Sequence, residues 1–241
     1  MKALILAAGY ATRMGTLALD RPKALLEVGG RPVIDHLVQA LRSISSIEQI
    51  ALVTNHKFAG HFREWSAERS TFGVRIIDDG TTSNENRLGA IADLQFAIAE
   101  GAGADDLLVA AADNIFMLSF PAFFRFFAQR ATDCITAHRE SDIAKLRKTG
   151  VIEMDANGRV LSFEEKPDAP RSQFACPPLY LFRKDTLSLV AEYLAAGANP
   201  DAPGYFIQWL ASRRLLHAFL FEEPRYAIGD EESYRRACEV F

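Results

Sequence analysis

The first half of the chain alternates short apolar runs with amphipathic segments, and this alternation restricts the fold more than any other feature. The apolar runs have the length of buried strands, and the segments between them have the 3.6-residue period of helices. The expected strands cover residues 3–6, 49–54, 74–78 and 105–111, and the expected helices cover 33–43, 56–68 and 87–99. Such an order is typical of a parallel sheet with helices on both faces.

The second half is richer in strand patterns. Strands are expected at 133–138, 149–155, 159–163, 174–182 and 217–221, and helices at 185–194, at 204–214 and from residue 231. Asp155-Ala156-Asn157-Gly158 predicts a hairpin turn between the second and third of these strands. We therefore predict an α/β fold with a Rossmann-like, mixed but mostly parallel sheet in three α/β/α layers, and with the second half packed beside the sheet.

Length and composition predict one domain. A chain of 241 residues that is 49% hydrophobic can bury a full core. No linker or repeat interrupts it, so we predict a single domain over residues 1–241, made of two halves at about 1–115 and 116–241.

Charge and cysteine content restrict the class of protein. The net charge of −4 argues against a nucleic-acid surface, and no apolar run is long enough to span a membrane. Cys134, Cys176 and Cys238 form no CxxC pair, which is typical of a reducing compartment. Met1-Lys2 leads directly into the first strand and leaves no room for a signal peptide, so we expect a cytoplasmic protein.

The loop after the first strand suits a nucleotide. Ala7-Ala8-Gly9 is a run of small residues, so a flat ligand can lie against its backbone. Arg13 and, ten residues later, Lys23 add two separated cations. Neither the GxGxxG pattern nor the P-loop pattern is present. Small residues followed by two cations indicate a site for a nucleoside triphosphate.

Asp113 is a candidate metal ligand because it directly follows an apolar run at 107–112. Magnesium is bound by one or two carboxylates together with phosphate oxygens. The carboxyl ends of parallel strands meet at one edge of a sheet, so Asp113 and the opening loop should lie close together. The other interpretation, a helix N-cap, is weaker because the next helix is expected to begin only near Ser119.

Four runs of the opening loop form a recognisable series. They are Leu6-Ala7-Ala8-Gly9, Thr12-Arg13-Met14, Pro22-Lys23 and Leu26-Glu27-Val28-x-x-Arg31-Pro32. The series closely resembles the N-terminal signature of the sugar-phosphate nucleotidyltransferases, with Ala11 and Thr16 where a glycine and a proline are usual. The resemblance implies a reaction in which a sugar 1-phosphate oxygen attacks the α-phosphorus of a nucleoside triphosphate and releases pyrophosphate.

The resemblance also implies a nucleotide-binding half at about residues 1–115 and an acceptor-binding half at about 116–241. The first half would hold the nucleoside triphosphate, which is the donor of the reaction. Arg13 and Lys23 would hold the triphosphate and neutralise the leaving group. The nucleotide would be bound by Leu6, Ala7, Ala8, Gly9, Thr12, Asn84 and Gly89. Asn84 would read the base edge, although it fits the cap of the following helix equally well, and Asn86 is a second candidate for the same role.

On the acceptor side, Thr149-Gly150 and Glu164-Glu165-Lys166-Pro167 resemble the sugar-binding strand and the E-K-P motif of the family. The resemblance implies that Lys166 binds the sugar phosphate and offsets the repulsion between two anions. The acceptor would be bound by Asn114, Gly150, Glu165 and Tyr180. The other interpretation of the motif is an exposed charged turn. Pro178 stands where a glycine is usual, so the sugar is left unspecified.

The C-terminal segment departs most from the family. Tyr226 to Tyr234 resembles the closing motif D-x-G-T-P-E-x-Y, but Ala227 stands at the position of its metal-binding aspartate. Either Asp230 supplies the second carboxylate beside Asp113, or Asp113, phosphates and water hold the metal. Asp230 fits the N-cap of the last helix equally well.

We therefore predict Mg²⁺-dependent transfer of a nucleotidyl group from a nucleoside triphosphate to a sugar 1-phosphate, without nucleic-acid or membrane partners. The donor could be UTP, dTTP, CTP or GTP, and a pyrimidine nucleotide is favoured. The chain could also form a homo-oligomer. One alternative is a cytidylyltransferase for a non-sugar phosphate such as phosphocholine, with Glu164, Glu165 and Tyr180 around the cationic group. Another is a nucleotide-binding regulatory protein without catalysis, which Ala227 suggests.

Overall fold

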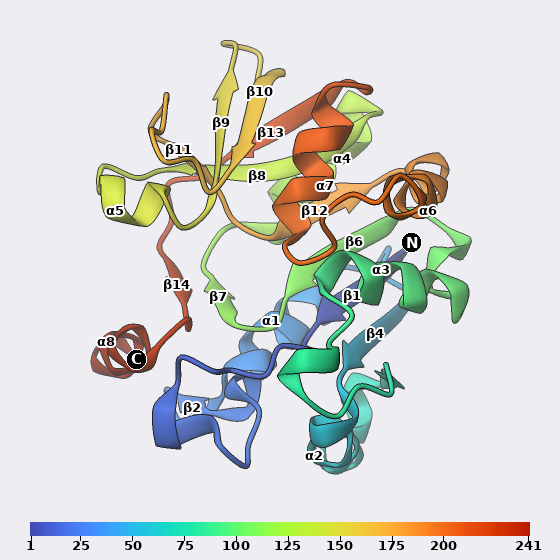
Figure 1. Cartoon of the computed structure of the whole chain (residues 1–241), viewed down its shortest axis with the longest axis vertical. Helices are drawn as coiled ribbons and strands as arrows, with labels where there is room; N and C mark the ends of the chain where they lie inside the picture. The colour runs from blue at the N-terminus through green and yellow to red at the C-terminus, as the bar shows by residue number, and fades with distance from the viewer.

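The computed structural model describes residues 1–241 and contains a ten-stranded central sheet (Figure 1). Nine strands follow one another in the order β10-β9-β11-β8-β12-β6-β1-β4-β5, and β13 pairs with β8. Their bounds are β1 (Lys2–Leu6), β4 (Gln49–Thr54), β5 (Val74–Asp78), β6 (Leu107–Ala111), β8 (Asp133–Arg139), β9 (Gly150–Met154), β10 (Val160–Glu165), β11 (Phe174–Cys176), β12 (Leu179–Phe182) and β13 (Leu216–Leu220). Only β10, β11 and β12 run against the common direction, which confirms a mixed, mostly parallel sheet.

Helices cover both faces of the sheet, as predicted. One face carries α1 (Val33–Arg42), α2 (His56–Glu68) and α4 (Phe120–Arg130), and the other carries α3 (Ala90–Ala99), α6 (Ser188–Ala195) and α7 (Pro203–Ala211). Successive residues of a strand point to opposite faces, so Ile5 packs in the first core and Leu4 in the second. The three-layer α/β/α arrangement follows.

The remaining elements lie around this sandwich (Figure 1). A ribbon of β7 (Asn114–Phe116) and β14 (Arg225–Ala227) leads to α8 (Glu231–Val240). Helix α8 packs against the hairpin of β2 (Glu27–Val28) and β3 (Arg31–Pro32), and the short helix α5 (Ile143–Leu146) precedes β9. The C-terminal segment therefore returns to the N-terminal half of the chain.

We expected the second half to pack beside the sheet. Instead, its strands continue the same sheet. Strand β12 lies between β6 and β8 and is antiparallel to both, with Leu181 opposite Leu108 and Cys134. Residues more than 70 positions apart are therefore joined by backbone hydrogen bonds, so the two halves share one sheet and two cores.

Local signals account for most element boundaries. Asn55 and Ser119 cap α2 and α4 through their side chains, and the expected hairpin turn joins β9 to β10 with Gly158 at a φ of 79°. The phenylalanine-rich helix α4 buries Phe120, Phe123 and Phe127 in the core. These aromatic residues therefore act in packing.

Several expected boundaries differ from the structure by a few residues, and two of these differences affect the site. The strand expected at 174–182 is broken into β11 and β12, because Pro177 and Pro178 have no N–H for a central ladder. The helix expected from residue 87 begins only at Ala90, because Gly89 has a φ of 93°, outside the helical range. Both breaks matter to the site, since Pro178 and Gly89 line its cleft.

Candidate functional site

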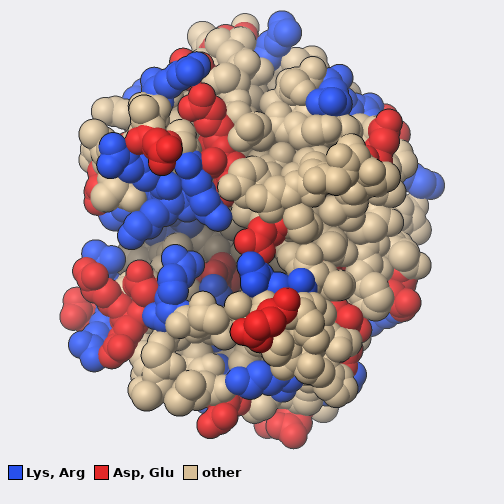
Figure 2. Space-filling view, in the orientation of Figure 1, with Lys and Arg blue, Asp and Glu red and all other residues tan.

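A cleft of about 510 Å³ opens at the carboxyl ends of β1 and β6, between residues of the two halves. Figure 2 shows the hollow, with Lys and Arg side chains gathered along the side that Figure 1 assigns to α5 and the base of β9 and β10. All the residues we predicted to bind nucleotide, acceptor or metal line this cleft except Asn114 and Asp230. The topology therefore brings the donor and acceptor candidates into one space.

The loop after β1 is held in place by hydrogen bonds to the end of β4. The Ala7 N–H donates to the Val53 carbonyl at 2.8 Å, and the Asn55 side chain donates to the Ala8 carbonyl at 2.9 Å. Ala11 has a φ of 53°, a left-handed conformation that glycine adopts more easily. Arg13 follows on the cleft wall, is exposed and takes part in no ion pair. Its guanidinium is therefore free for an anionic ligand.

Lys23 and Asp113 form an ion pair at the centre of the cleft. The Lys23 ammonium contacts Asp113 Oδ2, and the two side chains are 22% and 23% exposed. Burial alone would raise the pKa of Asp113, but the charge and hydrogen bond of Lys23 outweigh it and lower the pKa. Asp113 is therefore a carboxylate at neutral pH, and Lys23 balances its charge.

Behind this pair, the β7–β14 ribbon positions Asp113. Asn114 is 2% exposed, donates through Nδ2 to Asp113 Oδ1 at 2.7 Å and accepts from Arg225 Nη1 at 2.6 Å. The structure thus places Asn114 outside the cleft lining, where its side chain holds the carboxylate that faces the cleft.

The side of the cleft that we expect to bind the acceptor is built around Glu165 and Lys166, which follow one another at the end of β10. The Glu165 side chain is 7% exposed, and Lys166 Nζ lies 3.8 Å from its Oε1. Burial raises the pKa of Glu165, and the charge of Lys166 partly offsets this. Lys166 has a φ of 50°, a strained conformation of the kind that occurs at functional sites.

Two glycines make room for the Glu165 carboxylate. A Cβ at Gly204, in the first turn of α7, would overlap Glu165 Oε2, and one at Gly150 would overlap the Phe163 ring and lie 3.2 Å from Oε2. Gln208 of α7 accepts the Glu165 N–H at 2.9 Å. The carboxylate thus lies over the N-terminus of α7, where the helix dipole favours a negative charge. Tyr180 also lines this region and is 2% exposed.

Asn84 and Gly89 belong to a turn that is fastened to the start of α7. Asn84 lies in a short 3₁₀ turn, Asn84–Asn86, which Ser83 caps, so Asn84 itself is not the cap. Asn86 Oδ1 accepts from the backbone of residues 82 and 83, so its amide serves the turn. A Cβ at Gly89 would lie 2.7 Å from the Pro200 carbonyl oxygen, and glycine therefore allows this close approach.

The structure places Asp230 outside the cleft lining, at the N-cap of α8. Its Oδ1 accepts the Ser233 N–H at 2.9 Å in a capping box, and this bonding lowers the pKa of Asp230. Ala227 pairs with Asn114 in the β7–β14 ribbon, so the position of the expected second carboxylate lies next to Asp113. No group of three His, Cys, Asp or Glu side chains could hold a metal ion. Asp113 alone fits Mg²⁺ when phosphate oxygens and water complete the coordination.

Several cleft residues were not predicted from the sequence, namely Tyr10, Arg87, Asp93, Lys148, Asp201 and Gly204. Arg87 forms an ion pair with Asp201 at 3.1 Å across 114 residues, which no local pattern signals. Lys148 adjoins the predicted Thr149-Gly150, and a glycine in the first turn of a helix, as at Gly204, is itself a signal of close approach.

The fold and this two-sided cleft define a class of protein. Residues 2–237 match the family model described as nucleotidyl transferase, so the chain belongs to that family. No helix has the length and apolar character that crossing a bilayer would need.

Individual relatives within this family can also be compared with the chain. The chain is 30% identical over 202 residues to a glucose-1-phosphate thymidylyltransferase of Mycolicibacterium smegmatis, covering 83% of this chain and 67% of that protein. It is also 30% identical to a glucose-1-phosphate thymidylyltransferase of Actinoplanes sp., covering 85% and 63%. The chain thus spans about two thirds of the length of these curated relatives. The crystal structure of a UDP-glucose pyrophosphorylase complexed with UDP-glucose superposes with a TM-score of 0.82 at 19% identity, over 99% of this chain and 97% of that one. This last likeness concerns the fold.

Proposed function

We propose that the chain transfers a nucleotidyl group from a nucleoside triphosphate to a sugar 1-phosphate, giving a nucleoside diphosphate sugar and pyrophosphate. The observation that carries the proposal is the arrangement of charge in one cleft. Arg13 and Lys23 lie on the donor side, Lys166 lies on the acceptor side, and the Asp113 carboxylate lies between the halves. Relatives that are 30% identical are named for this type of reaction.

The chemistry needs positioning and charge rather than a covalent intermediate. An oxygen of the sugar phosphate forms a bond to the α-phosphorus, and the bond from that phosphorus to the pyrophosphate oxygen breaks. Lys166 reduces the repulsion between the two anions, and Arg13 stabilises the charge that develops on the pyrophosphate. Glu165 is placed to accept hydrogen bonds from sugar hydroxyls.

Lys23 and Asp113 prepare the centre of the site. When a triphosphate arrives, we expect the Lys23 ammonium to turn from Asp113 to a phosphate oxygen, which frees the carboxylate. Asp113 would then hold Mg²⁺ with phosphate oxygens and water, and the ion would neutralise phosphate charge. Asn114 and Arg225 keep the carboxylate oriented during this exchange.

Pyrophosphate release tests the proposal. The chain would be incubated with Mg²⁺, each of ATP, GTP, CTP, UTP and dTTP, and a panel of sugar 1-phosphates and phosphocholine. We expect release with at least one sugar 1-phosphate and none without an acceptor. Turnover with phosphocholine alone would favour the cytidylyltransferase alternative, and nucleotide binding without turnover on any acceptor would favour a regulatory protein.

A further inference from the structure

Two acidic side chains, Asp79 and Asp93, meet beside the cleft, and no basic side chain of the protein pairs with either of them. Asp93 is 5% exposed, lies in the first turn of α3 and lines the cleft. Asp79 follows the end of β5. Oδ1 of Asp93 and Oδ2 of Asp79 are both buried and accept no hydrogen bond. Buried acceptors are normally paired, so these two oxygens need a proton between them, and the other oxygen of Asp93, on the wall of the cleft, has no protein donor.

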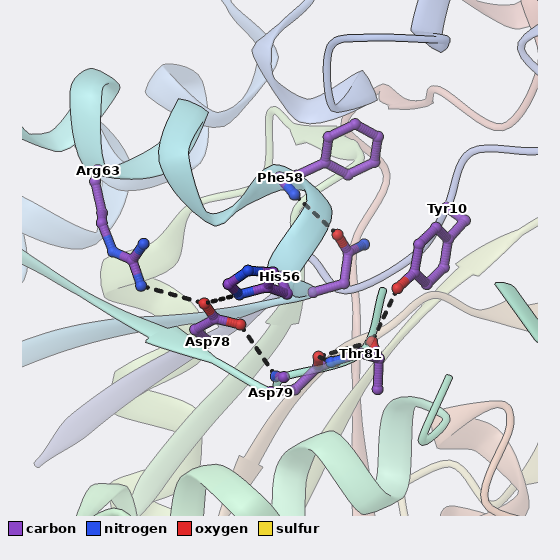
Figure 3. Close-up of polar contacts among 9 residues, drawn as sticks. Tyr10, His56, Phe58, Arg63, Asp78, Asp79 and Thr81 are labelled. Carbon is purple, nitrogen blue, oxygen red and sulfur yellow. Dashed lines mark hydrogen bonds and ion pairs between the residues drawn. The ribbon is translucent and has the colours of Figure 1, made fainter. Parts of the chain in front are cut away.

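The adjacent Asp78 shows what a paired carboxylate looks like in this region (Figure 3). Its Oδ2 accepts from His56 Nδ1 at 2.8 Å and from Arg63 Nη2 at 3.2 Å. Asp79 and Asp93 form no ion pair with any Lys, Arg or His side chain. The lack of a basic partner is therefore specific to Asp79 and Asp93, since the neighbouring Asp78 has two such partners.

Asp79 has a fixed orientation (Figure 3). Its Oδ1 accepts from both the N–H and the hydroxyl of Thr81, each at 2.7 Å, and the Tyr10 hydroxyl donates to Thr81 Oγ1 at 3.0 Å. Tyr10 also lines the cleft. Because Oδ1 is occupied, only Oδ2 of Asp79 is available to the side chain of Asp93.

The two carboxyl groups share a proton. Burial, the negative charge of Asp79 and a hydrogen bond to Asp79 raise the pKa of Asp93 to about 8. Asp93 is therefore mostly a neutral acid at pH 7, and its O–H donates to Asp79. Because Oδ1 of Asp93 is buried and turned to Asp79, the remaining oxygen, Oδ2, offers only lone pairs, and a cleft ligand beside it must be a donor.

We propose that Asp93 determines which nucleobase the cleft accepts, by accepting a hydrogen bond from an amino group of the base. This inference rests on the proposed nucleotidyl transfer. The Asp93 N–H bonds the Gly89 carbonyl at 2.8 Å, so Asp93 belongs to the part of the cleft that includes Gly89 and Asn84. The Asn84 amide can turn to suit any base, whereas Asp93 is fixed as an acceptor.

The nucleobases differ in what they present to such an acceptor. Guanine, cytosine and adenine carry an amino group, whereas uracil and thymine present carbonyl oxygens on both sides of one N–H. A fixed acceptor pairs with an amino group, whereas an acceptor that pairs with the N3–H of uracil or thymine lies between two carbonyl oxygens that repel it. The expected donors are therefore GTP, CTP or ATP, and UTP and dTTP are disfavoured.

Calorimetric titration with ATP, GTP, CTP, UTP and dTTP in the presence of Mg²⁺ tests this selectivity without an acceptor. We expect at least one amino-bearing nucleotide to bind about tenfold or more tightly than UTP and dTTP. In Asp93→Asn the amide can turn its N–H₂ toward a carbonyl, so the ratio should fall several-fold. Glu100→Gln, an exposed acid at the other end of α3, is the matched control and should keep the ratio.

Three results would overturn the assignment. They are a preference of the native chain for UTP or dTTP, an unchanged ratio in a folded Asp93→Asn, and loss of the ratio in Asp79→Asn alone. If Asp93→Asn does not fold, Asp79→Asn can be tested in its place. This variant retains the Asp93 acceptor and should therefore retain the preference for nucleotides with an amino group on the base. Sugar 1-phosphate turnover with a UTP or dTTP preference contradicts only the role of Asp93. Binding of no nucleotide contradicts both proposals.

Discussion

At the scale of single residues, Arg13 is a cation on the cleft wall that no acid neutralises. Lys23 and Lys166, the other cations assigned to the reaction, pair with Asp113 and Glu165, whereas Arg13 forms no ion pair. The sequence placed Arg13 and Lys23 correctly in one cleft, because both follow β1 in a loop whose small residues restrict where it can lie. It carried no signal for Asp93, which is the single charged residue of helix α3.

Replacing Arg13 by alanine should remove turnover without affecting the fold. We expect kcat/KM to fall by about 10²–10³-fold, because a preorganised charge on the leaving group is lost. The side chain is exposed, so the midpoint of thermal unfolding should stay within about 1–2 °C of the native value. Arg21→Ala, which removes an exposed arginine outside the cleft, is the control. Near-native activity in Arg13→Ala would refute the assigned donor site.

The raised pKa of Asp93 predicts a pH dependence of stability. The folded state holds this proton up to about pH 8, whereas the unfolded chain releases it near pH 4. The folded state thus binds more protons between these values, so stability is highest below pH 4 for this group and declines as pH rises to 8. In Asp93→Asn this decline is absent, and the variant should gain in unfolding midpoint over the native chain as pH rises from 5 to 8.5. A difference that stays constant with pH would contradict the shared proton.

At the scale of elements, the junction between β10 and α7 decides the geometry of the acceptor side. The strand delivers Glu165 and Lys166, and the first turn of α7 has no side chain at Gly204 to obstruct the carboxylate. The sequence predicted both elements but not their contact. Strand and helix periodicity are local properties, whereas the distance between Glu165 and Gly204 depends on how α7 packs against β10.

Gly204→Ala should therefore damage acceptor binding selectively. The new Cβ forces Glu165 to move, so we expect the KM for the acceptor to rise by about tenfold or more while the nucleotide Kd is unchanged. In a Glu165→Ala background the same change should cost much less stability, because all three nearest atoms belong to Glu165.

Gly60→Ala is the matched control for this prediction. Gly60 is exposed inside α2, and a Cβ there would meet no atom within 4 Å. We expect a gain of about 0.5–1 kcal/mol in stability from helix propensity and no change in either substrate constant. Equal kinetic effects of the two substitutions would contradict the role given to Gly204.

At the scale of the whole molecule, the shared sheet predicts that the chain unfolds as a single domain. The halves are joined along β6 and β12, and each core draws residues from both halves. Trp65 lies in α2 of the first half and Trp209 in α7 of the second. Fluorescence of Trp65→Phe and Trp209→Phe in urea should each match the circular dichroism midpoint of the same variant. Separate midpoints would show that the halves unfold independently.

The sequence by itself determined the layers, the strand directions of the first half, the capped helices and the place of the opening loop, because periodicity and caps act within a few residues. Only the tertiary structure decided which distant groups meet: Lys23 with Asp113, Gly204 with Glu165, and Asp79 with Asp93. It also decided that β12 enters the sheet and that Asp230 lies outside the cleft lining. These contacts depend on burial and on the packing of elements far apart in the chain, and no local pattern encodes either.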